Sequence, residues 1–160
     1  MSLTTLDNST VLTLLQNLGI PASAYKPRHD ALAVWKLGDL PSAFLPWWTA
    51  FLSRNGLATW KSAWCCNDFA RLFSAMADIS SFEELRALGG QDNISVGSPV
   101  LEMWGHFKEV NNAYHAINLV LVDDGSAVRF VAIEPQPGAQ DYVLSTQPGP
   151  DEFATVDLLQ

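Results

Sequence analysis

Three residues whose side chains together support nucleophilic catalysis occur at Cys66, His115 and Glu134. An ionised thiol is a nucleophile, a neighbouring imidazole takes and returns its proton, and a carboxylate orients the imidazole. Cys66 follows Cys65 in the stretch WCCNDFARLF, His115 begins an apolar stretch, and Glu134 ends the next one. This set predicts acyl transfer from an amide or peptide bond through a thioester, with Cys66 as nucleophile, His115 as general base and then acid, and Glu134 as the orienting residue.

His115 and Glu134 lie at the open ends of a predicted β-hairpin. Two apolar stretches flank the Asp-Gly dipeptide at 124–125, which is among the strongest signals for a two-residue hairpin turn. That turn places Leu121 opposite Val128 and His115 opposite Glu134. Directly opposed side chains have Cβ atoms about 5 Å apart, within hydrogen-bonding reach of each other. The alternative is a half-buried structural His–Glu pair.

The nucleophile is expected at the start of the most regular helix, over residues 65–78. Apolar residues recur there at helical spacing, at Phe69, Leu72, Phe73 and Met76. This periodicity turns Cys65 inward and leaves Cys66 at the edge of the apolar stripe. The unpaired amides and dipole of a helix N-terminus favour a thiolate. The alternative is that each cysteine is a small buried hydrophobic residue.

The remaining pattern predicts an α+β fold in one domain over residues 1–160. Residues 1–56 form a helical N-terminal part, 57–145 a catalytic-type core and 146–160 an acidic tail. The central Cys-bearing helix is expected to pack on a C-terminal antiparallel sheet. Further helices are expected over 9–18, over 41–56 with a bend near Pro46, and over 80–90 with a Ser80–Glu83 capping box and an end at Gly89. Strands are expected over 94–97, 99–104, 114–122, 127–134 and 140–145.

Composition excludes several classes of function. The 160 residues are 48% hydrophobic, which is ample for a core, and the net charge of −8 disfavours nucleic acid and anionic membrane surfaces as partners. Lys36, Asp39 and two prolines interrupt the most apolar segment, 31–52, before it is long enough for a membrane span. The only two cysteines are adjacent and provide no disulfide framework. Without a secretory signal at the start of this chain, a cytoplasmic location is the default expectation. The oligomeric state is not determined by these features.

Three short motifs carry a family resemblance. Residues 66–70, CNDFA, resemble the Cys-x-x-aromatic-small start of the central helix in papain-like cysteine peptidases and transglutaminase-like proteins. His115-Ala116 resembles their His-Ala at the start of a core strand, and Glu134-Pro135 resembles the Asp-Pro that closes the next strand in transglutaminase-like sequences. The cysteine-protease domain of certain fungal chimerolectins is similar in size and uses glutamate as its third residue. The resemblance implies a thiol protease or related hydrolase with a peptide or protein substrate.

The residue expected to stabilise the oxyanion of the reaction differs from that of papain-like enzymes. Papain-like enzymes place a glutamine six residues before the nucleophile, where this chain has Trp60. Its indole N–H can donate the same hydrogen bond, beside the backbone N–H of Cys66, although a core tryptophan is the alternative. Gln136 is expected to reach the mouth of the site, and His106 to line the same cleft or to be an ordinary loop histidine. Asn118 is expected on the opposite strand face, hydrogen-bonded in the interior.

Metal binding is the other chemistry that these residue types support. Cys66, His115 and Glu134 are acceptable zinc ligands, with Cys65 or His106 as a fourth, but the usual paired spacing of zinc ligands is absent. We therefore predict no metal. Resemblance to the chimerolectin proteases, which depend on calcium, implies calcium as an alternative cofactor. The residues that would bind it are Asp123, Asp124, Asp151 and Glu152. The simpler interpretation is that these are ordinary solvated acidic residues. Two rival functions remain: a non-catalytic binding module that retains the papain-like fold, and a metal-stabilised interaction domain.

Overall fold

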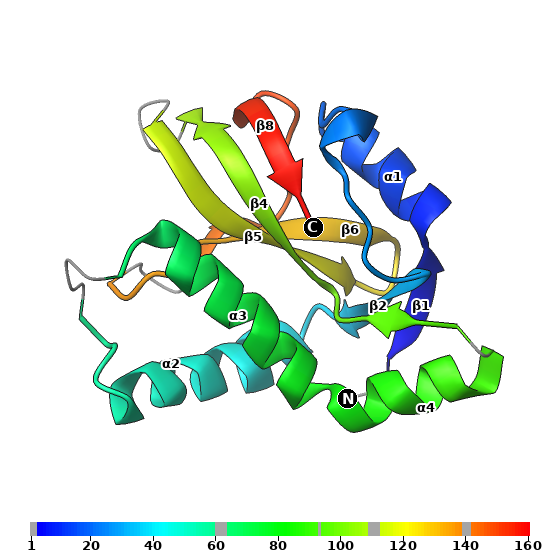
Figure 1. Ribbon diagram of the computed structural model, residues 1–160, viewed down its shortest axis with the longest axis horizontal. Coiled ribbons are helices and arrows are strands. Elements are labelled where there is room, and N and C mark those ends of the chain that lie inside the picture. Colours follow the sequence, from blue (N-terminus) through cyan, green and yellow to red (C-terminus); the bar gives the residue numbers. More distant parts are fainter. Residues whose placement is uncertain (1–2, 60–63, 93, 109–112, 139–141) are drawn as a thin grey trace.

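The two apolar stretches around the Asp-Gly dipeptide pair as an antiparallel hairpin of strands β5 (Ala113–Asp123) and β6 (Val128–Ile133). The structure is a computed structural model that describes residues 3–59, 64–92, 94–108, 113–138 and 142–160 (Figure 1). Consecutive residues of β5 are buried from Ala116 to Val122. Such a run is typical of a strand with both faces covered. The hairpin is therefore part of the core.

The register of this hairpin differs from the predicted one by two residues. Leu121 lies opposite Phe130 rather than Val128, because the connection is a four-residue loop from Asp124 to Ala127. The Asp124 side chain holds this loop by accepting hydrogen bonds from the amides of Ser126 and Ala127 and from the Arg129 guanidinium. A shift of two residues keeps every side chain on its face of the sheet. His115 and Glu134 thus remain on one face as diagonal neighbours, although the predicted direct opposition is wrong.

All described strands join one eight-stranded sheet. Its main path is β1-β2-β5-β4-β8; β3 pairs with β2, and β7 pairs with β6. Beyond the hairpin, the strands are β1 (Thr4–Asp7), β2 (Ala31–Lys36), β3 (Val96–Gly97), β4 (Val100–Phe107), β7 (Val143–Ser145) and β8 (Phe153–Leu159).

The pattern predicted a helical first third of the chain, but this part also contains strands. Strands β1 and β2 lie within it, and β2 pairs in parallel with both β3 and β5. The sheet is therefore mixed rather than antiparallel. Five of the six residues of β2 are buried, so the strand has no polar and apolar alternation that would mark it in the sequence. The observed class remains α+β.

Part of the predicted acidic tail forms a strand that was not expected: Phe153–Leu159 is strand β8, which pairs with β4. Its apolar residues Phe153, Val156 and Leu159 pack on the core, and Asp157 is the acidic residue between them in the sequence. Gly105 permits this close pairing. A Cβ atom at Gly105 would lie 2.1 Å from the Thr155 carbonyl oxygen, which is far inside contact distance.

The α-helices lie close to their predicted positions but differ at their ends. They are α1 (Asn8–Asn17), α2 (Leu45–Arg54), α3 (Cys66–Ser80) and α4 (Phe82–Asp92), with short helical turns η1 (Ala22–Ala24) and η2 (Leu40–Phe44). Asp7 caps α1 by accepting from the Thr10 amide, so the helix begins at Asn8, one residue before the predicted start. The irregular π-type turn η2 precedes α2, so the bend falls before Pro46.

The Ser80 capping box is wrong because α3 continues to Ser80, whose hydroxyl donates to the Ala77 carbonyl. Helix α4 runs past Gly89 to its end at Asp92. A single residue, Ser81, separates the two helices. The sequence contains no glycine or proline at this junction, so the pattern did not locate it.

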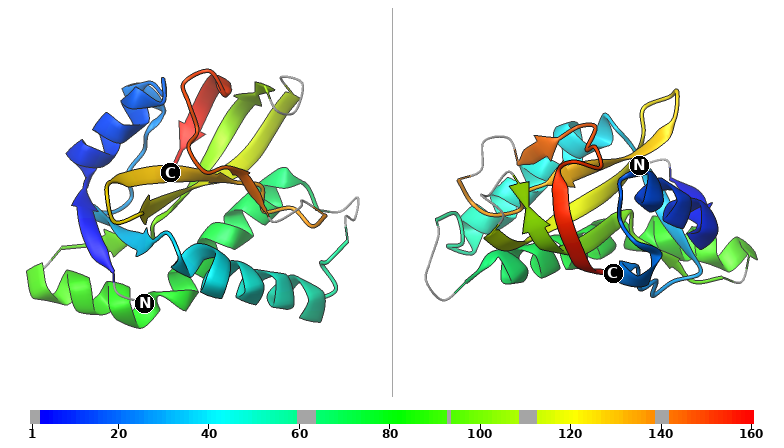
Figure 2. Two further views of the ribbon diagram at one scale, coloured as in Figure 1. Left: turned by 180° about the vertical axis from the view of Figure 1, so that it is seen from behind. Right: turned by 90° about the horizontal axis from the view of Figure 1, so that it is seen from above.

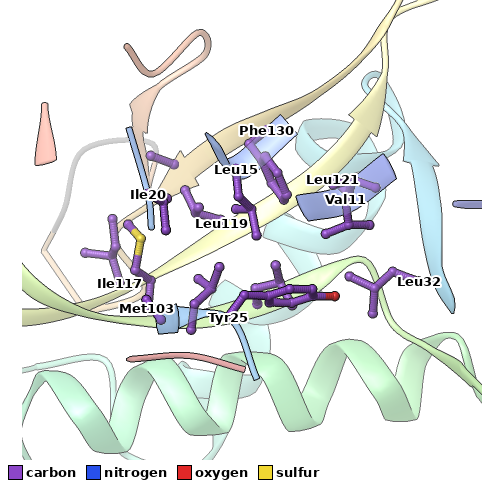
Figure 3. Close-up of a cluster of buried hydrophobic side chains, with 14 of the residues drawn as sticks. Val11, Leu15, Ile20, Tyr25, Leu32, Met103, Ile117, Leu119, Leu121 and Phe130 are labelled. Carbon is purple, nitrogen blue, oxygen red and sulfur yellow. The ribbon is translucent and has the colours of Figure 1, made fainter. Parts of the chain in front are cut away.

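Helices cover both faces of the sheet. Helices α2, α3 and α4 lie along one side and α1 lies on the other (Figures 1 and 2). The α1 side contains a cluster that includes Val11, Leu15 and alternate residues of β5 (Figure 3). The opposite side contains Trp48 and Phe73 packed on the other residues of β5. None of the helices within the described ranges is both long and apolar enough to span a membrane.

Candidate active site

The first turn of α3 presents Cys66 at the boundary between core and solvent. Cys66 is the first residue of the helix and is half-buried, in agreement with the edge position predicted. Cys65 is the N-cap residue, with extended dihedral angles of φ −117° and ψ 179°. Its thiol is exposed and donates to Asp68 Oδ2 at 3.2 Å. The prediction that Cys65 turns inward is wrong, because helical periodicity does not extend to a residue with extended backbone.

Helix α3 is held across β5 by packing and by one buried hydrogen bond. Phe69 and Phe73 are fully buried beneath the helix. Asn118 Nδ2 donates to the Ala70 carbonyl oxygen at 3.1 Å, which confirms the interior hydrogen bond predicted for Asn118. The acceptor lies about one turn after Cys66, so this contact ties the helix start to the strand that carries His115.

His115 is the third residue of β5 and lies beside the start of α3. The imidazole and the Cys66 thiol shift each other's pKa, and the neighbouring Ala116 amide adds to the lowering of the pKa of Cys66. The residue opposite His115 in β4 is Gly105, which has no side chain, and the Phe107 ring stands edge-on to the imidazole at 6.3 Å between centroids. Strand β5 therefore provides both groups that act on the Cys66 thiol, the His115 imidazole and the Ala116 amide.

Glu134 follows β6 directly and completes a line of three side chains. His115 Nε2 donates to Glu134 Oε2 at 2.5 Å, and the two side chains are 15% and 12% exposed. Because Nε2 is engaged by the carboxylate, Nδ1 is the ring nitrogen that is left for Cys66. The structure thus brings together all three residues that the sequence predicted as catalytic.

The carboxylate of Glu134 is held in position by its own loop. Its Oε1 accepts from the Gln136 amide at 3.1 Å, and the Glu134 amide donates to the Tyr142 carbonyl at 2.9 Å. The buried indole of Trp48 donates to the Pro135 carbonyl at 3.3 Å. Both oxygens of the carboxylate therefore have partners, and its loop is anchored to helix α2.

The electrostatics of the site favour a thiolate and an imidazolium. Burial raises the pKa of the Cys66 thiol, but hydrogen bonds from His115 and the Ala116 amide, together with the imidazolium charge, lower it by more, so the net pKa lies below the usual 9.0. Burial lowers the pKa of His115, but bonds to Cys66 and Glu134 and the charge of Glu134 raise it to about 9. Each group stabilises the charged form of its neighbour.

The other predicted cleft residues have different positions. The Gln136 side-chain amide lies 3.3 Å from His115 Nε2, so this residue does reach the site. The His106 ring stands edge-on to Tyr114, 5.3 Å between centroids, on the strand beside His115, and it belongs to strand β4 rather than to the loop that we expected. Trp60, the predicted oxyanion donor, lies outside the described residues.

Three of the four acidic residues considered for calcium accept hydrogen bonds within loops. Asp123 Oδ1 accepts from the Gly125 amide, and Asp124 holds the hairpin loop. Glu152 accepts from the Ser145 hydroxyl and the Gly149 amide. In the described part of the chain, no group of three or more His, Cys, Asp and Glu side chains is arranged to hold a metal ion. The residues do not form a recognisable site for calcium or zinc.

Two residues that position the site were not predicted from the sequence. Trp48 supports the Glu134 loop from a helix that is far away along the chain. Glu102 is a buried carboxylate in β4 that contacts the Arg71 guanidinium at 3.4 Å and so links β4 to α3. A charged residue inside the apolar run PVLEMW was the available signal for Glu102; one tryptophan among six gave no signal for Trp48.

No protein-family model matches the sequence, and no curated protein shows significant sequence similarity to it. The proposal for its function therefore depends on the geometry of the site and on the motifs.

Proposed function

We propose that the protein is a cysteine-dependent hydrolase or acyl transferase with Cys66, His115 and Glu134 as its catalytic triad, built on a papain-like or transglutaminase-like core. The observation that supports the proposal is the arrangement of the three side chains: His115 is hydrogen-bonded to Glu134, and the interaction between His115 and the Cys66 thiol lowers the pKa of the thiol. Its substrate class is a peptide or protein amide, as the motif resemblance implies. Water is the default acceptor, since no amine-binding group is identified.

In this mechanism the Cys66 thiolate attacks the carbonyl carbon of the scissile amide. The negative charge that develops on the carbonyl oxygen is stabilised by the backbone amide of Cys66, which is in the first turn of α3 and so has no acceptor within the helix. His115 donates its proton to the leaving amine as the thioester forms, and then removes a proton from water for the second step. Glu134 keeps the imidazole oriented and stabilises its charged form throughout.

The test is alkylation by iodoacetamide, with Cys65 as an internal comparison. We expect Cys66 in the native protein to react at about pH 7 roughly tenfold faster than Cys65, and to lose less of its reactivity as the pH falls than an unperturbed thiol would, because its pKa is lowered. Cys65→Ala should retain the fast reaction and Cys66→Ala should lose it. Peptide mapping assigns the label to each cysteine.

The competing function, a non-catalytic binding module, gives a different result. In such a protein both thiols would react slowly, with the steep pH dependence of a free thiol, until the chain is unfolded. That outcome would refute the enzyme proposal, since a thiol that is never ionised near neutral pH cannot begin the reaction.

A further inference from the structure

Cys65 is a second thiol next to the proposed nucleophile, and the mechanism above does not use it. These two are the only cysteines in the chain. Cys65 is exposed and Cys66 is half-buried, so neither residue is sealed in the core. Each thiol donates to one side-chain acceptor at 3.2 Å, Asp68 for Cys65 and Asn67 for Cys66, and the Cys66 thiol also interacts with His115. Oxidation of Cys66 removes the negative charge that favours its interaction with the imidazolium, so the oxidised sulfur can turn toward Cys65.

We propose that Cys65 and Cys66 form a reversible oxidative modification site, in which hydrogen peroxide oxidises Cys66 and Cys65 then closes a disulfide between the two adjacent residues. This inference rests on the proposed function, because it uses the same ionised Cys66. It assigns Cys65 the role of a resolving cysteine that protects the nucleophile from irreversible oxidation.

The chemistry proceeds in two balanced steps. The Cys66 thiolate attacks one oxygen of hydrogen peroxide and the O–O bond breaks, which gives a sulfenic acid and hydroxide; the His115 imidazolium donates its proton to the hydroxide and forms water. Cys66 is oxidised by two electrons and the peroxide is reduced. The Cys65 sulfur then attacks the sulfenyl sulfur, the S–O bond breaks, and the hydroxyl leaves with the Cys65 proton as a second water.

The position of the pair at the helix boundary confines the structural change. Cys65 has extended backbone and Cys66 begins the helix, so the disulfide ring would close at the boundary of α3 and not within it. The amide of Cys65 donates to Asp68 Oδ2 at 2.9 Å, and this bond does not involve either thiol. The rest of α3 is anchored by Phe69 and Phe73 in the core. Oxidation should therefore remove the nucleophile without unfolding the helix.

The same adjacency makes the disulfide easy to reduce. Neighbouring Cα atoms are about 3.8 Å apart, closer than the roughly 4.4–6.8 Å that most disulfides span. A bond formed at that separation is strained, and strained, exposed disulfides have oxidising potentials. A dithiol should restore both thiols, so the modification acts as a temporary block on Cys66.

The experiment compares the wild-type protein with Cys65→Ser after treatment with hydrogen peroxide. We expect the intact wild-type mass to fall by two hydrogen atoms, with loss of labelling by iodoacetamide and about full recovery after dithiothreitol. The Cys65→Ser protein should instead gain oxygen atoms and lose labelling of Cys66 irreversibly. A wild-type protein that gains oxygen atoms as the variant does, forms dimers between chains or keeps its mass unchanged would overturn the inference.

The two proposals fail in distinguishable ways, because mass is measured independently of reactivity. If Cys66 reacts slowly with iodoacetamide at neutral pH but the protein loses two hydrogen atoms on oxidation, the disulfide proposal stands and the enzyme proposal is refuted. If Cys66 reacts quickly but is oxidised to sulfinic acid despite the presence of Cys65, the enzyme proposal stands and the resolving role of Cys65 is refuted.

Discussion

Replacing Glu134 by glutamine tests the proposed triad most directly, since this substitution removes one charge and keeps the shape of the side chain. The amide oxygen of glutamine can still accept from His115 Nε2, which is now 2.5 Å from a carboxylate oxygen. A neighbouring charge shifts a pKa by about one to three units, and we use the lower end because both side chains are partly exposed. One unit corresponds to a tenfold change in the protonation equilibrium.

The expected result is a fall in the pKa of His115 from its raised value of about 9. With a pKa about one unit lower, the imidazolium next to Cys66 loses its proton about one pH unit earlier, at about pH 8 instead of about pH 9. The part of the alkylation profile of Cys66 that reports loss of the imidazolium should therefore move down by about one pH unit, while the rate at about pH 7 changes little, because the imidazole is still mostly protonated there. The assay is the rate of iodoacetamide incorporation between about pH 5 and pH 10.

The matched control is Glu83→Gln, which removes the same charge from an exposed carboxylate in the first turn of α4, at the opposite end of α3 from Cys66. It should leave the profile of Cys66 unchanged. If Glu134→Gln also leaves the profile unchanged in a protein that remains folded, the carboxylate does not act on the imidazole, and the interpretation of residues 66, 115 and 134 as one coupled unit would be refuted.

Two further predictions concern stability. His115→Gln should lower the free energy of unfolding most below about pH 6.5, and the difference from wild type should disappear above about pH 9. Folding raises the pKa of His115 from 6.5 to about 9, so the charged imidazole contributes its full stabilisation below pH 6.5. This stabilisation is lost as the pH rises through about 9. Urea unfolding at about pH 6 and pH 9.5 checks this, and a constant difference would contradict it. Gly105→Ala should destabilise the protein by about 1–3 kcal/mol, because the new methyl group would meet the Thr155 carbonyl at 2.1 Å and force β8 away from β4. Gly90→Ala, whose new methyl group meets nothing within 4 Å, is the control and should not destabilise, so equal losses in the two variants would refute the steric explanation.

The catalytic candidates could be predicted because their signals are local. A cysteine that precedes an apolar stripe of helical spacing predicts a thiol at a helix start, and α3 begins at Cys66. An Asp-Gly dipeptide between two apolar runs predicts a hairpin whose ends meet. The observed register differs by two residues, and such a shift leaves each side chain on the predicted face of the sheet. His115 and Glu134 therefore come together although the exact pairing was wrong.

Other features depended on partners that are distant along the chain. Strand β2 has no alternation because both of its faces are covered, and its parallel pairing with β5 follows from the path of the whole chain. Strand β8 forms because β4 offers it an edge at Gly105, where a side chain would prevent close approach. The inward placement predicted for Cys65 failed because an N-cap residue does not follow helical periodicity.

By itself, the sequence determined the residue types of the site, their order, and the secondary structure that carries Cys66 and His115, because hydrophobic periodicity and turn residues act over a few neighbours. Only the tertiary structure decided that the sulfur meets the imidazole, because this contact requires α3 to cross β5 at the height set by Asn118 and Ala70. It also decided the support of the Glu134 loop by Trp48, since a hydrogen bond between residues 87 positions apart leaves no local trace in the sequence.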